Sequence, residues 1–473
     1  MHYTTLISSA LAMFAAAPVH ANGPAWVAEL SDTTTARNDS LSVSIPIGSH
    51  AAIAVYNSDA IEPKCPDGIN ATVRVMWFEH RSVFVGWPGE REEAIPYYLP
   101  MLKDCRPTGA WVVELEPEHV GTFTVPIACN TNALTITVEC IELPRGDIGY
   151  GFYTDHHRVP DLSREREYNR DMAAHGMTTF TPYARIPSPT LTAGDATYVD
   201  DTPHKLAWHI NTAIADGLVD VRFPLLCLSA GADAVVASKE FAKGEWPELV
   251  LYNRDEPSPE HGEEVRLNAE DAHAAGLKSG TAISGESALA IGDPLDIWVL
   301  HMDGVSDETI AAAEAKGKDL WMYNCALRGS NAAQHRYWTG VYTWAVGPRV
   351  CLTWTYMHDK DSRIQPDGTW NCLRVYDTAT CDAEGLPIPT VALEGIQEGI
   401  IDSRFLQELE RLDTEAGNAY LDNLKKSVPF GFWTNGHGRD YSSYVWDVPD
   451  LQVPPVDCVG VRREVLRLLE AAE

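Results

Sequence analysis

The sequence predicts an α/β fold, a (β/α)8 barrel preceded by an N-terminal β-sandwich. Short strand-like segments with Gly, Pro and Asp between them occupy residues 22–144, where no helical period of useful length appears. From residue 145 to 427, eight strand-like runs alternate with helix-like segments. No G-x-G-x-x-G or G-x-x-x-x-G-K-[ST] turn is present, which disfavours an open nucleotide-binding sheet.

The strand pattern of the first domain is one of alternation. Residues 41–45 and 135–138 alternate apolar and polar side chains, and residues 111–115 and 121–127 form two more strand-like runs. Such alternation is typical of strands with one face in a core, as in a sandwich.

The barrel elements can be assigned in order. We expect strands at 148–155, 177–183, 219–228, 249–251, 280–284, 295–301, 319–325 and 349–356. We expect helices at 163–175, 203–216, 233–243, 269–275, 306–316, 334–344 and 393–412. Residues 428–473 are interpreted as a C-terminal extension, with a short helix at 462–469, packed on the barrel.

Composition limits the partners. The 473 residues include 36 Lys and Arg against 67 Asp and Glu, a formal net charge of −31. Such a charge repels nucleic acid and anionic membrane surfaces, so we expect neither as a partner. No later segment is long and apolar enough to span a bilayer.

The first residues resemble a signal peptide. An apolar run at 7–17 is followed by Val19, His20 and Ala21, an A-x-A-like cleavage site. We therefore expect residues 1–21 to be removed and the protein to be exported, to the periplasm or outside the cell.

The ten cysteines contain no C-x-x-C pair, which disfavours zinc ribbons and thioredoxin-type sites. In an exported protein, proximity suggests three pairings: Cys65–Cys105, Cys129–Cys140 and Cys372–Cys381. Cys227, Cys325 and Cys351 lie in apolar runs and are expected to be buried thiols. We expect no cofactor and no metal. A site built from Asp155, His156, His157 and Asp201 is disfavoured because adjacent strand residues point to opposite sides.

Two adjacent carboxylates follow the fourth barrel strand. The apolar run at 249–251 gives way to Asp255 and Glu256, immediately before Pro257. Proline cannot continue the strand ladder, so both acids are expected at the strand's carboxyl end, which is the catalytic face of a barrel.

The seventh strand ends in Tyr323, Asn324 and Cys325 and supplies no carboxylate. Two-carboxylate glycosidases need a second acid across the anomeric carbon. The absence of a carboxylate at the end of the seventh strand favours a mechanism in which the acetamido oxygen of an N-acetylhexosamine is the nucleophile. Glu256 would then be the general acid, and Asp255 would hold the acetamido N–H and stabilise the oxazolinium ion. The hydroxyl of Tyr323 is placed to reach the acetamido oxygen.

Other strand ends supply candidate substrate-binding residues. The full predicted set is Asp155, Tyr183, Arg185, Tyr323, Asn324 and Trp354. Tyr and Trp are dense between residues 321 and 376, which suits stacking against sugar rings, although we expect Trp321 and Tyr342 to pack in the core.

Several segments together resemble glycoside hydrolase family 123. They are GFYTD (151–155), MAAHGM (172–177), YNRDEP (252–257), LDIWV (295–299), KDLWMYN (318–324), residues 337–356 and EGIQEGIIDSRFLQELE (394–410). The resemblance implies a β-sandwich ahead of a barrel, with Glu256 as the acid/base and Asp255 as the acetamido-orienting residue. It also implies an exo-acting, retaining hydrolase of β-linked N-acetylgalactosamine or a related N-acetylhexosamine, with an oligosaccharide or glycoconjugate substrate.

Two alternatives stay open. One is a two-carboxylate glycosidase for non-acetylated sugars, with Glu256 as the acid and Glu286, Asp303 or Asp359 as the second group. The other is a carbohydrate-binding barrel without catalytic activity. The sequence does not indicate an oligomeric state.

Overall fold

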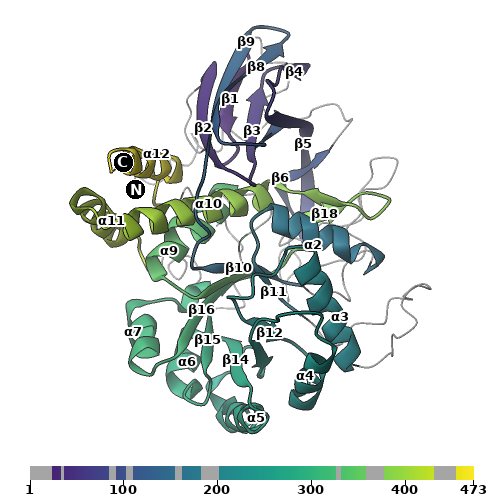
Figure 1. The fold of residues 1–473 in the computed structure, drawn as a ribbon, viewed down its shortest axis with the longest axis vertical. Helices are drawn as coiled ribbons and strands as arrows, with labels where there is room; N and C mark the ends of the chain where they lie inside the picture. Colours follow the sequence, from purple (N-terminus) through teal and green to yellow (C-terminus); the bar gives the residue numbers. More distant parts are fainter. Residues whose placement is uncertain are drawn as a thin grey trace.

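A computed structural model describes residues 24–32, 37–84, 92–102, 110–154, 162–182, 202–325, 327, 332–357, 378–430 and 454–472. An all-β domain lies above a barrel, and a long helix, α10 (Val391–Leu412), runs between them (Figure 1). The expected residues 1–21 of a signal peptide lie outside the described part of the chain.

The N-terminal domain is a sandwich of two sheets. One sheet has the order β1 (Trp26–Glu29), β3 (Ala51–Tyr56), β7 (Ala110–Pro117), β5 (Ile69–Phe84) and β6 (Glu92–Leu102). The other has the order β2 (Ser40–Pro46), β9 (Ala133–Ile141), β8 (Gly121–Cys129) and β4 (Ile61–Pro63). β2 and β9 run parallel, and the other pairs are antiparallel. The apolar residues of the alternating strands, such as Val113, Val125 and Ile136, form the core between the sheets.

Eight parallel strands form the second domain. They are β10 (Gly149–Tyr153), β11 (Thr179–Thr181), β12 (Leu225–Cys227), β13 (Leu249–Tyr252), β14 (Lys278–Ile283), β15 (Ile297–His301), β16 (Asp319–Asn324) and β17 (Val350–Thr353). The sheet closes between its end strands, where the Leu228 N–H donates to the Pro182 carbonyl at 2.9 Å. The predicted fold class, a barrel preceded by a sandwich, is confirmed.

Helices cover the outside of the barrel (Figure 1). They are α2 (Glu165–Ala174), α3 (Thr202–Ala215), α4 (Ala232–Ser238), α5 (Gly262–Ala274), α6 (Gly285–Ile291), α7 (Asp307–Ala315), α8 (Ala332–Tyr337) and α9 (Thr343–Val346), with a π-helical segment, Trp338–Tyr342, between the last two. The remaining elements are the short helices η1 (Leu162–Arg164), η2 (Lys239–Phe241), η3 (Pro259–His261) and η4 (Met302–Gly304), the strands β18 (Ala379–Cys381) and β19 (Pro387–Pro389), and the helices α11 (Glu415–Ser427) and α12 (Cys458–Glu470).

Successive strand residues alternate between two apolar clusters. On β13, Val250 and Tyr252 pack inside the barrel, whereas Leu249 and Leu251 pack against the helices. On β16, Trp321 and Tyr323 likewise point inward. The strand at 249–251 is therefore buried on both faces, as its unbroken apolar run predicted.

The EGIQEGIID motif has a packing explanation. Its two glycines lie on the face of α10 that contacts α8 and the π-helical segment. A Cβ at Gly399 would lie 2.0 Å from Thr339 Oγ1, and one at Gly395 would lie 2.2 Å from the Ala332 carbonyl oxygen. Only glycine permits these helices to approach so closely.

Buried ion pairs fasten the C-terminal helix to this core. Arg336 of α8 and Arg462 of α12 both bond to Asp402 of α10. Arg462 also bonds to Glu398, and Arg336 bonds to Glu29 of the sandwich at 2.8 Å. The network therefore connects both domains and α12 through α10.

Some sequence predictions need correction. The helices α6 and α11 were not expected, and α5 begins several residues earlier than predicted. The predicted Cys129–Cys140 disulfide is wrong: both are free thiols, and β8–β9 pairing places Cys140 opposite Gly121, far from Cys129. The other two pairings involve Cys105 and Cys372, which lie outside the described residues. Cys227 and Cys351 are buried thiols, as expected, whereas Cys325 is only partly buried.

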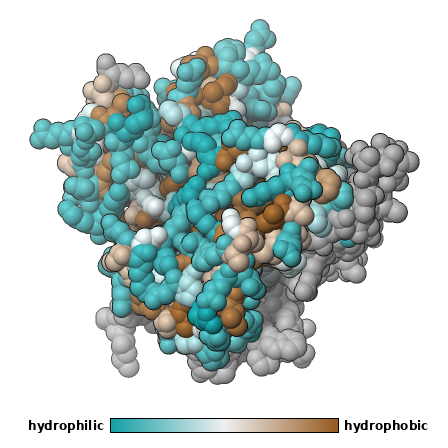
Figure 2. Space-filling model, turned by 60° about the horizontal axis from the view of Figure 1, so that its bottom comes forward, coloured by the Kyte–Doolittle hydropathy of each residue, from teal (hydrophilic) through white to brown (hydrophobic). Residues whose placement is uncertain are grey.

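Hydrophilic residues dominate the face shown in Figure 2, and apolar residues form small separate groups on it. Within the described residues, no helix combines the length and apolar character that a membrane span requires.

Candidate active site at the carboxyl ends of the barrel strands

The end of β13 is held rigidly by hydrogen bonds. Asn253 is buried; its side-chain amide donates to the Val265 carbonyl at 3.1 Å and to Ser279 Oγ at 2.9 Å. Its Oδ1 accepts from the Arg254 N–H at 2.7 Å, and Thr281 Oγ1 donates to the Arg254 carbonyl at 2.5 Å. The next two residues, Asp255 and Glu256, therefore start from a fixed backbone position.

Glu256 has an unusual backbone conformation. Its φ is +40°, in the left-handed region that non-glycine residues seldom adopt. Such a conformation costs on the order of 1–3 kcal/mol and is found most often at functional sites. Pro257 follows at once, and Ser258 then caps η3 (Pro259–His261) through its contacts with His261.

Each carboxylate is bonded to a tyrosine from inside the barrel. The Tyr323 hydroxyl donates to Glu256 Oε1, and the Tyr252 hydroxyl donates to Asp255 Oδ1. Burial, together with the neighbouring carboxylate in each case, raises the pKa of both tyrosines well above 10. Both phenols therefore stay protonated donors at ordinary pH. The two carboxylates themselves are exposed at the barrel mouth.

A second chain of polar groups touches Tyr323. The His301 ring lies 5.0 Å from the Tyr323 ring, its Nδ1 bonds to Asp303, and its Nε2 lies 3.2 Å from Cys325 Sγ. Burial alone would lower the pKa of His301, but Cys325 and Asp303 raise it well above its ordinary value. Tyr153 packs on the other side, with its ring 5.8 Å from that of Tyr323. The phenol of Tyr323 is thus fixed from two sides.

Two other predicted site residues are described. Trp354 is partly buried and packs against the aromatic and apolar residues inside the barrel mouth. Asn324 is fully buried on the opposite face of β16 from Tyr323, where its amide donates to Thr353 Oγ1 at 3.0 Å. The structure thus brings Trp354, but not Asn324, to the same side as the carboxylates.

Most of the other predicted residues belong to segments that the structure does not describe. Asp155, Tyr183 and Arg185 lie outside the described residues, as do His156, His157, Asp201 and Asp359. Of the alternative second carboxylates, Asp303 bonds to His301, and Glu286 lies exposed in the first turn of α6.

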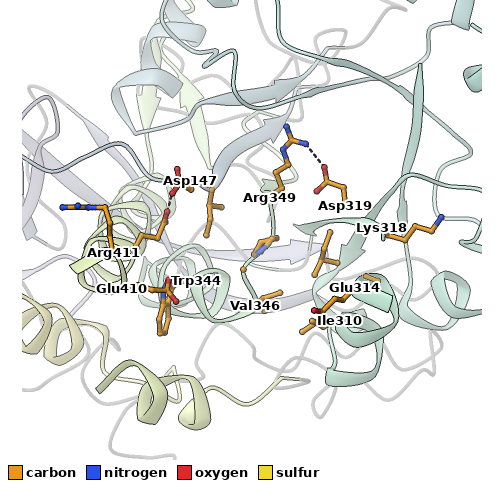
Figure 3. A pocket seen from close by; sticks show the side chains of 16 residues that line it. Asp147, Ile310, Glu314, Lys318, Asp319, Trp344, Val346, Arg349, Glu410 and Arg411 are labelled. Atoms are coloured by element: carbon orange, nitrogen blue, oxygen red, sulfur yellow. Dashed lines mark hydrogen bonds and ion pairs between the residues drawn. The ribbon is translucent and has the colours of Figure 1, made fainter. Parts of the chain in front are cut away.

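A cavity of about 820 Å³ lies at the other end of the barrel (Figure 3). It is lined by residues at the amino ends of β10, β16 and β17, including Asp147, Asp319 and Arg349. Arg349 and Asp319 form an ion pair at 3.0 Å. In barrels that end serves stability, whereas catalytic residues gather at the carboxyl ends. We therefore place the candidate site at Glu256.

Sequence reasoning missed Tyr252 as a site residue. The predicted strand ends at residue 251, whereas β13 continues to Tyr252, and the inward direction of Tyr252 follows from its alternation with Val250. The contact of His301 with Cys325 depends on the β15–β16 pairing, which no local pattern of the sequence indicates.

Comparison with known proteins shows what the chain is similar to. No family model matches it, and no curated protein matches its sequence. A family 123 glycoside hydrolase from Clostridium perfringens, analysed for glycolipid glycan hydrolysis, is similar over 95% of this chain and 100% of its own, with a TM-score of 0.62 and 10% identity.

Two further structures are less similar. A Bacteroidetes-affiliated family 5 cellulase covers 60% of this chain and 96% of its own, with 12% identity and a TM-score of 0.34. An endo-β1,6-glucanase covers 58% and 82%, with 11% identity and a TM-score of 0.37. The likeness to the Clostridium perfringens structure confirms the predicted resemblance to glycoside hydrolase family 123 at the level of the fold.

Proposed function

We propose that the protein is a retaining glycoside hydrolase that removes terminal β-linked N-acetylhexosamine, with N-acetylgalactosamine as the first candidate. The observation that carries the proposal is the pair of adjacent carboxylates after β13, each bonded to a different inward-facing tyrosine: Glu256 to Tyr323, and Asp255 to Tyr252. Two acids with separate partners can take separate chemical roles.

Glu256 is the proton donor in this mechanism. It protonates the glycosidic oxygen as the bond to the anomeric carbon breaks, and the substrate's acetamido oxygen attacks that carbon. Asp255 accepts the acetamido N–H and stabilises the positive charge of the oxazolinium ion. A water molecule then attacks the anomeric carbon, and the carboxylate of Glu256 takes a proton from this water, which restores the acid. The bond from the anomeric carbon to the acetamido oxygen breaks, so the oxazolinium ring opens and the acetamido group is restored.

The residues after β16 support the substrate-assisted route over a two-carboxylate route. The strand ends in Tyr323 and Asn324, and the chain continues as Cys-Ala-Leu-Arg (325–328), without an acid that could act as a nucleophile. Trp354, which is partly exposed at the barrel mouth, supplies aromatic surface that suits a sugar ring. The likeness in fold to the Clostridium perfringens enzyme supports glycan hydrolysis by analogy.

Export would place such an enzyme where glycoconjugates occur. This part of the proposal depends on the signal-peptide-like residues 1–21. N-terminal sequencing of the secreted or periplasmic protein tests it: a mature chain that begins near Asn22 supports export, and an intact cytoplasmic chain contradicts it.

Aryl glycosides with and without a 2-acetamido group test the function. We expect turnover only of the acetamido substrates, inhibition by a thiazoline analogue of the intermediate, and a loss of about 10²–10⁴-fold in Glu256→Gln and Asp255→Asn. Glu263→Gln is the matched control, because Glu263 lies exposed nearby on α5, where it pairs with Arg266.

Two outcomes would overturn the proposal. Hydrolysis of plain hexosides that survives Asp255→Asn would indicate a two-carboxylate glycosidase. Glycan binding without turnover of any substrate would indicate a carbohydrate-binding barrel.

A further inference from the structure

One partly buried and two fully buried side chains from distant parts of the chain meet where the sandwich contacts α10. His50 lies in the turn between β2 and β3, His175 caps the end of α2, and Glu394 lies in the first turn of α10. Their ligating atoms all lie within 4.8 Å of one another. Only 4% of the His175 side chain and 2% of the Glu394 side chain are exposed.

The two imidazoles both turn the same ring nitrogen toward the carboxylate. His50 Nε2 lies 2.9 Å from Glu394 Oε2, and His175 Nε2 lies 3.3 Å from Glu394 Oε1. The rings meet edge to face at 5.1 Å. Two imidazole nitrogens and two carboxylate oxygens thus converge on one point.

The hydrogen bond of the other ring nitrogen of His175 limits what can lie between His175 Nε2 and the Glu394 carboxylate. Its Nδ1 is 2.7 Å from the Asp171 carbonyl oxygen, so it must donate its hydrogen there. A neutral His175 then directs the lone pair of Nε2 at an ionised carboxylate, which is repulsive. Either a second proton or a cation must separate the two groups.

The surroundings favour positive charge. The Asp171 carboxylate lies 3.6 Å from His175 Nδ1, so a second carboxylate besides Glu394 faces this ring. Glu114, which pairs with Arg74, adds another carboxylate close to His50.

The site is also held in place from its outer side. Gln397 Nε2, one turn after Glu394, donates to the His50 carbonyl at 2.6 Å and fixes that turn to α10. Metal-bound histidines usually donate their second ring N–H to a carbonyl or carboxylate, as His175 does to Asp171.

We propose that His50, His175 and Glu394 bind a divalent cation of the zinc class that fastens the sandwich to the barrel domain. Two imidazole nitrogens and a carboxylate are a donor set that zinc accepts readily. The cation replaces the proton between Nε2 of each histidine and the carboxylate. Its role is structural, because the site lies at the junction with α10 and not among the strand ends that carry Glu256.

Metal content of the full chain, purified without chelator and without a histidine tag, tests the proposal. We expect about one zinc per chain in the wild type and less than about a fifth of that in His50→Ala and His175→Ala. His273→Ala is the control, because His273 is an exposed histidine bonded to Asp296 on the barrel surface. The His273→Ala variant should contain as much zinc as the wild type.

Wild-type measurements keep the test decisive if the variants do not fold. Chelator should lower the melting temperature, and one equivalent of zinc should restore it. Cobalt(II) in place of zinc should give the visible absorption of a nitrogen- and oxygen-coordinated ion. A folded, chelator-treated wild type that takes up neither ion, with an unchanged melting temperature, would overturn the proposal and assign the cluster to imidazolium–carboxylate pairing.

Discussion

Tyr323 donates its hydroxyl hydrogen to Glu256, although 67 residues and the strands β14 and β15 separate them. Tyr323 is buried between the rings of Tyr153 and His301, so its hydroxyl has a fixed position. Glu256, on a strained and exposed turn, takes its orientation from this bond. Glu256, the proton donor of the proposed reaction, follows β13 and is therefore positioned by a residue of β16.

Tyr323→Phe should lower kcat by about 10–100-fold on acetamido substrates, because a hydrogen bond to a charged group contributes about 1.5–3 kcal/mol. KM should change much less, and the melting temperature should stay the same because the ring packing is kept. Steady-state kinetics beside thermal unfolding measure this. Tyr420→Phe, on α11 and remote from the site, is the control. An unchanged kcat in Tyr323→Phe would show that the Tyr323 hydroxyl does not position Glu256 for catalysis.

Tyr252→Phe should weaken the enzyme through Asp255. Without the Tyr252 hydroxyl, Asp255 loses the donor that orients it toward the acetamido N–H. We expect kcat/KM to fall by about tenfold or more on acetamido substrates, since one charge-assisted hydrogen bond is removed. The thiazoline inhibitor should bind more weakly by a similar factor, as measured by its inhibition constant. If thiazoline affinity and turnover are both unaffected, Asp255 is oriented by something else.

Arg462→Met should destabilise the fold. The arginine is buried and bonds to Asp402 and Glu398, and its loss leaves buried carboxylates with one cation fewer. Breaking a buried ion pair in this way costs about 3–5 kcal/mol. Urea unfolding measures the change.

Arg467→Met on the same helix provides the comparison for that experiment. Arg467 is exposed and forms a surface ion pair with Glu464, so its loss should change the free energy of unfolding by less than about 1 kcal/mol. Equal effects of the two substitutions would show that the buried network does not hold α12.

The metal-free protein should lose stability as the pH rises. His175 has a pKa near 6.5 when unfolded and about 9 when folded, since Asp171 and Glu394 outweigh the effect of burial. A pKa raised on folding stabilises fully below the unfolded value, and the contribution disappears as the pH passes the folded value. Chelator-treated protein should therefore lose on the order of 1–3 kcal/mol between about pH 6.5 and 9.

The groups that face His175 are His50, Glu394 and Asp171, and His175→Gln should flatten this pH dependence. Urea unfolding across the same pH range, with chelator present, measures it. Zinc-loaded protein should show the opposite trend, because protons compete with the cation for both imidazoles. A steep fall in stability that persists in His175→Gln would place the titrating group elsewhere.

Much of the architecture could be predicted because it depends on local patterns. Unbroken apolar runs, helix caps and terminal glycines such as Gly176 and Gly317 recur along the barrel and place its strands within a few residues. The helix α6 was missed because seven residues are too few to show a period. The helix α11 does carry a signal, with Gly417, Leu421 and Leu424 buried on one face behind an N-cap at Thr414.

The sequence by itself determined the order of the domains, the number of barrel strands and the position of Asp255 and Glu256 at a strand's carboxyl end. These follow from spacing over a few residues, because alternation and proline act locally. The tertiary structure alone decided that Tyr323 bonds to Glu256, that Tyr252 bonds to Asp255, and that Asn324 faces away. It also brought His50 and His175 to Glu394, which lies 344 and 219 residues further along the chain. Such contacts depend on strand register, barrel closure and domain packing, and no local pattern encodes them.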